Sequence, residues 1–200
     1  SPRADTQTYE DMAEDLAELI THIGGPVDLV GHSMGGKAAM VLALQHPDLL
    51  RRLIVADIAP VPYDHTQSHQ IAAMRAVDLS NITRRSEAAE QLSAQGVEPA
   101  LQSFFTQSLD VAGKQWRLNL DVLEAQMDHI IGFPEVSGQF PNPTLFLTGK
   151  DSDYVLPEHR PLIKSLFPGA RFAKLPDAGH WLHADKPRAF EAAVRTYLDA

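Results

Sequence analysis

The sequence predicts an α/β fold in which a mostly parallel sheet carries flanking helices and is interrupted by a helical insertion. Apolar, strand-like runs alternate with helical segments near both ends of the chain, and the long middle stretch shows helical spacing without a convincing strand. The order strand, helix, strand is typical of parallel strands joined by crossover helices. With 200 residues, the chain is long enough for one domain with a sizeable core.

The first half of the predicted core begins with an amphipathic helix over Tyr9–Ile23, in which apolar residues recur at three- and four-residue steps. Thr8 is its expected N-cap, because Asp11 follows three residues later, and Gly24 lies where the helix should end. The elements expected next are a strand, a turn, a helix and a second strand, at Val27–Val30, Gly31–Gly36, Lys37–His46 and Leu53–Ala56.

The second half of the core repeats this alternation, with strands and helices expected at Thr144–Thr148, His159–Leu166, Ala170–Leu175 and Pro187–Leu198. Between the halves, helical stretches are expected at Ser68–Asp78, Arg85–Ala94, Pro99–Ser108 and Leu118–Ile130. The chain should therefore consist of a core, residues 1–62 and 140–200, and an insertion, residues 63–139. Because ligands bind at the carboxyl edge of parallel sheets, we expect the insertion to act as a lid. A helical lobe without a gating role is the alternative.

The composition excludes several classes of protein. The net charge of −9, without a cluster of Lys and Arg, disfavours binding to nucleic acid or to an anionic membrane surface. The absence of cysteine excludes disulfides, thiol catalysis and thiolate metal sites. No apolar run approaches the roughly 20 residues that span a bilayer, and the polar start Ser1–Asp5 does not resemble a signal peptide. A cytoplasmic location is therefore expected.

The segment Gly31-His32-Ser33-Met34-Gly35 lies between a predicted strand and a predicted helix, as a nucleophile elbow requires. Small residues on both sides of Ser33 let strand and helix approach closely, and the helix N-terminus favours developing negative charge. Ser33 is therefore the expected nucleophile, and the N–H of Met34 the expected donor to an oxyanion. For His32 a packing role is the alternative to a contact in the site, and a glycine-rich turn with an idle serine is the alternative for the motif.

A serine hydroxyl needs an adjacent general base, which in this kind of fold lies late in the chain. His180 follows the last predicted strand in Ala178-Gly179-His180-Trp181 and is the expected base. His183 is its competitor, and Trp181 is a candidate for packing beneath this loop or for contacting substrate. Because a serine and histidine pair explains His180 without a metal, no metal is expected.

The acid is the unusual part of the pattern. Its usual position, three residues after a glycine that ends a strand, holds Ser152 in Gly149-Lys150-Asp151-Ser152. Asp57 directly follows the apolar strand Leu53–Ala56, where a carboxylate needs a partner or water. We expect Asp57 to be the acid and Ser152 to be a fourth, hydrogen-bonding member of the site. Asp151 or Asp153 is the alternative acid, and capping of a turn before Pro60 is the alternative role for Asp57.

Several segments together resemble bacterial short-acyl esterases and their mitochondrial relatives in the α/β-hydrolase superfamily. They are Gly31–Gly36, Asp57–Pro60, Trp116–Leu120, Gly132–Glu135, Gly149–Val155 and Ala178–Asp185, and the resemblance covers nearly the whole chain. It implies an acid at the Asp57 position, a serine at the Ser152 position, and hydrolysis of esters or thioesters without a cofactor. Such proteins carry further strands and a second oxyanion donor before the first helix, and this chain is expected to lack them.

The sequence thus predicts a serine hydrolase that cleaves small-molecule esters or thioesters of small to medium acyl groups through an acyl-enzyme on Ser33. Aromatic residues of the middle segment are candidates for an acyl pocket or for helix packing: Phe104, Phe105, Trp116 and Phe133. A dehalogenase is disfavoured, because that chemistry uses aspartate in place of Ser33. A cofactor-free haloperoxidase, a carbon–carbon hydrolase and a non-catalytic binding protein on the same scaffold remain alternatives.

Overall fold

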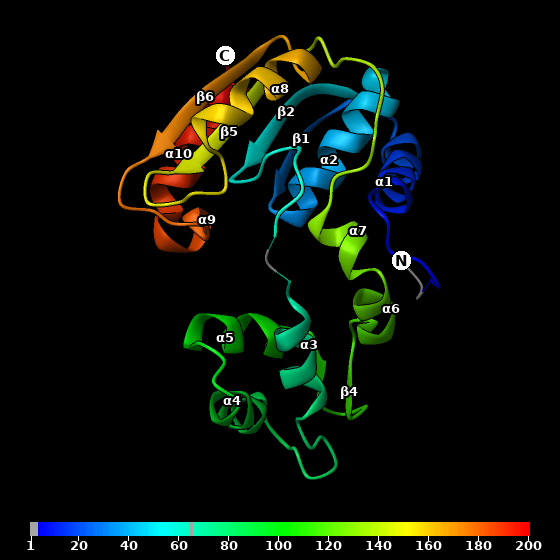
Figure 1. Ribbon diagram of the computed structural model, residues 1–200, viewed down its shortest axis with the longest axis vertical. Coiled ribbons are helices and arrows are strands. Elements are labelled where there is room, and N and C mark those ends of the chain that lie inside the picture. The colour runs from blue at the N-terminus through cyan, green and yellow to red at the C-terminus, as the bar shows by residue number, and fades with distance from the viewer. Residues whose placement is uncertain (1–3, 65) are drawn as a thin grey trace. The chain divides into compact units, whose positions relative to one another are not determined.

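The computed structural model describes residues 4–64 and 66–200 (Figure 1). Its contacts divide the chain into two compact units, each described here by itself. The core unit contains Thr8–Tyr63 and Gly132–Ala200, and the insertion unit contains Asp64–Ile131 together with the described residues up to Gln7. The core unit thus resumes at residue 132, whereas the sequence pattern predicts that it resumes at residue 140.

The core unit is built on a four-stranded sheet with the order β1-β2-β5-β6. Its strands are β1 (Val27–His32), β2 (Leu50–Ala56), β5 (Thr144–Gly149) and β6 (Ala170–Leu175), and every pairing between them is parallel. The predicted parallel sheet is confirmed, with the first three strands one to three residues longer than the apolar runs suggested. Their carboxyl ends lie at one edge of the sheet, which brings the residues after each strand together.

Both faces of the sheet are covered, which explains why its strands read as continuous apolar runs. On β2, Leu53 and Val55 pack in one cluster with α1 (Tyr9–Ile23), α2 (Met34–Gln45) and α8 (Arg160–Leu166). Ile54 and Ala56 point to the other face and pack with α9 (Leu182–Asp185) and α10 (Pro187–Leu198). Alternate residues of a strand point to opposite faces, so one strand contributes to two hydrophobic layers.

The helices of the core unit follow local sequence signals closely. Helix α1 has the predicted bounds, and Thr8 and Asp11 form a reciprocal capping box at its start. Helix α2 begins at Met34, three residues earlier than expected, because the turn after β1 consists of little more than Ser33. A 3-10 turn, Pro157–His159, precedes α8, and the four-residue helix α9 was not predicted because it is too short to show periodicity.

The insertion unit is helical, as expected, and has a hydrophobic core of its own that includes Phe105 and Trp116. Its helices are α3 (Ser68–Arg75), α4 (Arg85–Ala94), α5 (Pro99–Gln107), α6 (Leu120–Ala125) and α7 (Met127–Ile131). The expectation that it contains no strand is wrong, because β3 (Leu109–Asp110) and β4 (Gln115–Trp116) form a short antiparallel pair. Strands of two residues are too short to show alternation in sequence.

Candidate active site

Ser33 lies at the sharpest turn of the core unit, between the last residue of β1 and the first residue of α2. Its backbone has φ 52° and ψ −122°, a conformation that L residues rarely adopt. The turn remains tied to the sheet, because the N–H of Ser33 donates to the carbonyl of Ala56 at 3.0 Å. The hydroxyl is therefore held at the carboxyl edge of the sheet by a strained but well-connected backbone.

The glycines of the elbow do not share one role. A Cβ at Gly31 would lie 2.4 Å from the carbonyl oxygen of Gly35, and a Cβ at Gly36 would lie 2.6 Å from the side chain of Ile58. A Cβ at Gly35 would meet nothing within 4 Å among the described residues. The close approach of strand and helix thus requires Gly31 and Gly36, whereas the sequence motif singles out Gly31 and Gly35.

Asp57 lies at an equivalent place on the neighbouring strand. It directly follows β2, also has a positive φ of 52°, and donates its N–H to the carbonyl of Leu147 at 3.0 Å. Its side chain is fully buried at 0% exposure. The carboxylate nevertheless has partners, because it accepts hydrogen bonds from the N–H of Gly149 at 3.0 Å and from the hydroxyl of Ser152.

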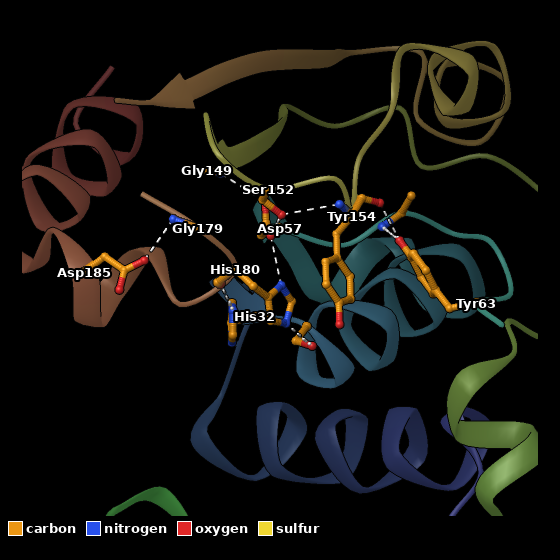
Figure 2. Close-up of polar contacts among 11 residues, drawn as sticks. His32, Asp57, Tyr63, Gly149, Ser152, Tyr154, Gly179, His180 and Asp185 are labelled. Atoms are coloured by element: carbon orange, nitrogen blue, oxygen red, sulfur yellow. Dashed lines mark hydrogen bonds and ion pairs between the residues drawn. The ribbon is translucent and has the colours of Figure 1, made fainter. Parts of the chain in front are cut away.

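His180 joins these two positions (Figure 2). Its Nε2 lies 2.9 Å from Oγ of Ser33, and its Nδ1 lies 2.9 Å from Oδ2 of Asp57. The structure therefore brings together the predicted nucleophile, base, acid and fourth member in one continuous chain of hydrogen bonds. Both separations fall within ordinary hydrogen-bond range. Such a chain can move a proton from a serine hydroxyl to an imidazole whose other nitrogen is held by a carboxylate.

The alternative acids, Asp151 and Asp153, and the alternative base, His183, are not part of this chain of hydrogen bonds. Asp151 and Asp153 have exposed side chains, and neither contacts His180 in the part of the chain that the structure describes. The backbone N–H of Asp151 instead donates to the carbonyl of Ala178 at 3.0 Å, which ties the two loops together. His183 packs its ring against those of His32 and Phe190.

His32, the residue before Ser33, contacts the loop that carries His180. Its Nε2–H donates to the backbone carbonyl of His180 at 2.8 Å, and its ring lies 5.5 Å from that of Trp181. Burial lowers the pKa of His32 to about 4, so the ring is neutral at pH 7. This arrangement corresponds to the packing role, and Trp181 packs beside the base rather than between it and Ser33.

Met34 is the first residue of α2, so its N–H is one of the helix N-terminal groups without an intrahelical partner. Its side chain is 40% exposed. An N–H in this position points where an anion is favoured, since the helix dipole adds to its partial positive charge. The structure therefore places the predicted oxyanion donor directly beside the nucleophile.

Sequence reasoning missed three residues that shape this site. Asp185 accepts a hydrogen bond from the N–H of Gly179 at 2.9 Å and so fixes the loop before His180. Tyr154 stacks on His180, and Tyr63 binds the backbone of Tyr154. A tyrosine in a loop carries no pattern of its own, and only the spacing of Tyr154 two residues after Ser152 could have drawn attention to it.

Across residues 4–64 and 66–200, no group of three or more His, Asp or Glu side chains is arranged to hold a metal ion. In the same residues, no helix combines the length and apolarity needed to cross a membrane.

Fold and site together define an α/β hydrolase with a serine, histidine and aspartate at its sheet edge. The model of the alpha/beta hydrolase family matches residues 1–193, and the chain belongs to this family. The chain is 44% identical to the mouse protein named sn-1-specific diacylglycerol lipase ABHD11, over 99% of this chain and 67% of that protein. It is 36% identical to esterase YbfF of Escherichia coli, over 100% of this chain and 78% of that protein.

A solved structure titled marine microorganism esterase superposes with a TM-score of 0.89 at 38% identity, covering 98% of this chain and 80% of that one. The resemblance to bacterial esterases is thereby confirmed. The chain spans about two thirds of the length of the vertebrate relatives, between 65% and 67%. Because these relatives are named esterases or lipases, the comparisons support a carboxylic ester hydrolase.

Proposed function

We propose that this protein is a serine hydrolase that cleaves carboxylic esters through an acyl-enzyme on Ser33. The observation that carries the proposal is the chain of hydrogen bonds from Ser33 through His180 to Asp57, with both links at 2.9 Å. The names of the relatives supply the reaction class. The hydrogen-bond chain supplies the means of activating a hydroxyl that is otherwise a weak nucleophile.

In the first half of the reaction, Nε2 of His180 takes the proton of Ser33 while Oγ attacks the acyl carbonyl. Asp57 holds the proton on Nδ1, which leaves Nε2 free to accept, and it stabilises the imidazolium that forms. The imidazolium then gives its proton to the leaving alcohol as the bond to the acyl carbon breaks. In the second half, His180 takes a proton from a water molecule as the water oxygen attacks the acyl carbon, and it gives that proton to Oγ of Ser33 as the acid is released.

The N–H of Met34 donates to the oxyanion that each tetrahedral intermediate carries. One such donor in a site without competing water is worth on the order of 3 kcal/mol in the transition state. Ser152 donates to the same carboxylate oxygen that contacts His180. It therefore holds the carboxylate of Asp57 in the orientation that faces Nδ1, without taking part in proton transfer.

The substrates we propose are esters of small to medium acyl groups, with thioesters as a second class. Diacylglycerol is a further candidate, because vertebrate relatives carry the name sn-1-specific diacylglycerol lipase. We also propose that the helical insertion, residues 63–139, acts as the lid of this site, because it leaves the core after the carboxyl end of β2, at the edge of a parallel sheet where ligands bind. A cytoplasmic location stays a prediction from the sequence.

The test is intact-mass analysis after treatment with a fluorophosphonate, which reacts preferentially with activated serines. We expect a single adduct on the wild-type protein and none on Ser33→Ala. An adduct of equal extent on Ser33→Ala, or no adduct on protein with a cooperative unfolding transition, would contradict the proposal. The second result would favour a non-catalytic binding protein.

A series of p-nitrophenyl esters and acyl thioesters of increasing chain length then defines the substrate. We expect ester turnover to depend on Ser33 at every chain length. If labelling depended on Ser33 while no ester or thioester was cleaved, a haloperoxidase or a carbon–carbon hydrolase would become the better interpretation of the same serine.

A further inference from the structure

Tyr154 lies flat against the imidazole of His180. The centroids of the two rings are 3.9 Å apart, and their planes differ by 18° (Figure 2). The other rings around His180 are tilted or edge-on: that of His32 lies 4.8 Å away at 41°, and that of Trp181 lies 5.6 Å away at 71°. Among the described residues, Tyr154 therefore contributes the one parallel stack on the proposed base.

The backbone of Tyr154 is held from two sides. The hydroxyl of Tyr63 donates to the carbonyl of Tyr154 at 2.7 Å and accepts from the N–H of Ala59 at 3.0 Å. The N–H of Tyr154 donates to the hydroxyl of Ser152 at 3.3 Å. Tyr63 thus links the segment after Asp57 to the segment after Ser152, and Tyr154 is fixed to both.

The groups that face His180 are few and well defined. Asp57 is the carboxylate on Nδ1, and the hydroxyl of Ser33 faces Nε2. His32 is neutral at pH 7, because burial lowers its pKa to about 4. Burial also raises the pKa of Tyr154, with a further increase from the negative charges of Asp153 and Asp57, so its ring stays an uncharged phenol. Among the described residues, a positive charge on the imidazole thus meets the carboxylate of Asp57 at its edge and the parallel ring of Tyr154 on its face.

We propose that Tyr154 is a positioning residue that holds the plane of His180 and stabilises its imidazolium during acyl transfer. The inference rests on the proposed function, in which His180 becomes protonated in each half of the reaction. A cation over an aromatic face is attracted by the negative quadrupole of the ring. A parallel stack also limits tilting of the imidazole, so Nε2 and Nδ1 stay aimed at Ser33 and Asp57 together.

The test compares Tyr154→Phe, which keeps the ring, with Tyr154→Leu, which keeps apolar bulk without a π face. For each variant, kcat/KM for a p-nitrophenyl ester is measured from pH 5 to pH 9. We expect Tyr154→Phe to stay within about threefold of the wild type. For Tyr154→Leu we expect the plateau to fall roughly three- to tenfold. We also expect the midpoint of its acidic limb to move to lower pH by several tenths of a unit.

The direction of the expected pH shift follows from the loss of the aromatic face. Removing the π face makes protonation of the base less favourable, so the base stays neutral to lower pH while the protonated transition state loses stabilisation. A purely structural role would lower the plateau and leave the limb in place. That result overturns the inference, as does an unchanged profile for Tyr154→Leu or an equal loss in both variants.

Two further variants keep the test decisive. If Tyr154→Leu lacks a cooperative unfolding transition, Tyr154→Met replaces it, because a flexible thioether fills irregular space. Ser33→Ala is assayed alongside, and full turnover by that variant would refute the proposed function itself. A loss of turnover in Ser33→Ala combined with a wild-type profile for Tyr154→Leu would refute only the role of the stack.

Discussion

The replacement Asp57→Asn is the sharpest test of the proposed proton chain. The carboxylate of Asp57 accepts hydrogen bonds from Gly149, Ser152 and His180, and every partner of this side chain among the described residues is a donor. An asparagine has one carbonyl oxygen and one NH₂ group. Because the side chain is 0% exposed, no solvent compensates for a mismatch in this position.

In either orientation, the amide that replaces the carboxylate of Asp57 in this variant disrupts the hydrogen bonds of the site. With its oxygen toward the N–H of Gly149, the NH₂ group faces His180 and forces Nδ1 to become an acceptor. The proton of the neutral imidazole then lies on Nε2, which can no longer accept the proton of Ser33. In the flipped orientation, the NH₂ group meets the N–H of Gly149 as a buried pair of donors, which destabilises the fold.

The expected loss in kcat is about 10⁴-fold, or roughly 5 kcal/mol in the barrier, the size found when a triad loses its tautomer control. The measurement is steady-state hydrolysis of a p-nitrophenyl ester, with thermal unfolding to show that the variant is folded. Asp151→Asn and Asp153→Asn are matched controls, since both side chains are exposed, and each is expected within twofold of the wild type. A folded Asp57→Asn that kept more than a tenth of kcat, or a hundredfold loss in either control, would refute the reasoning.

The remaining predictions concern buried groups around the site. Gly149→Ala should lower the thermal midpoint and should reduce turnover by more than tenfold, because its Cβ would lie 2.3 Å from the carbonyl oxygen of Gly179; normal activity would contradict this. Burial lowers the pKa of Lys37 to about 8 from 10.5, so the unfolded state binds more protons between these values. Urea unfolding should therefore show the wild type gaining about 3 kcal/mol relative to Lys37→Met as the pH rises from 8 to 10.5, and a flat difference would be inconsistent. The pKa of His32 is lowered to about 4 from 6.5, so the wild type should lose about 2 kcal/mol relative to His32→Gln as the pH falls through this window, after allowance for partial exposure. A difference independent of pH would show that this imidazole titrates alike in both states.

Local patterns were sufficient for the framework of the core unit. The periodicity and cap of Tyr9–Ile23 place that helix to the residue, because its apolar spacing and its Thr8–Asp11 capping box lie within the segment itself. The elbow at Ser33 is likewise predicted by five consecutive residues that lie between an apolar run and a helical segment. Short elements escaped this reasoning: β3, β4 and α9 are two to four residues long, and a pattern needs more residues than that to appear.

The choice among Asp57, Asp151 and Asp153 could be argued from the sequence but depends on contacts across the fold. Asp57 reaches His180 across 123 positions of sequence, because parallel pairing of β2 with β5 brings the ends of both strands to one edge. The stack of Tyr154 on His180 follows from no local pattern, although Tyr154 lies only two residues after Ser152. Helices, caps and the elbow are encoded by neighbours in the chain. The direction in which a carboxylate or a ring points is set instead by strand register and by close loop contacts, such as that between Gly149 and Gly179. These contacts form only when distant segments pack together.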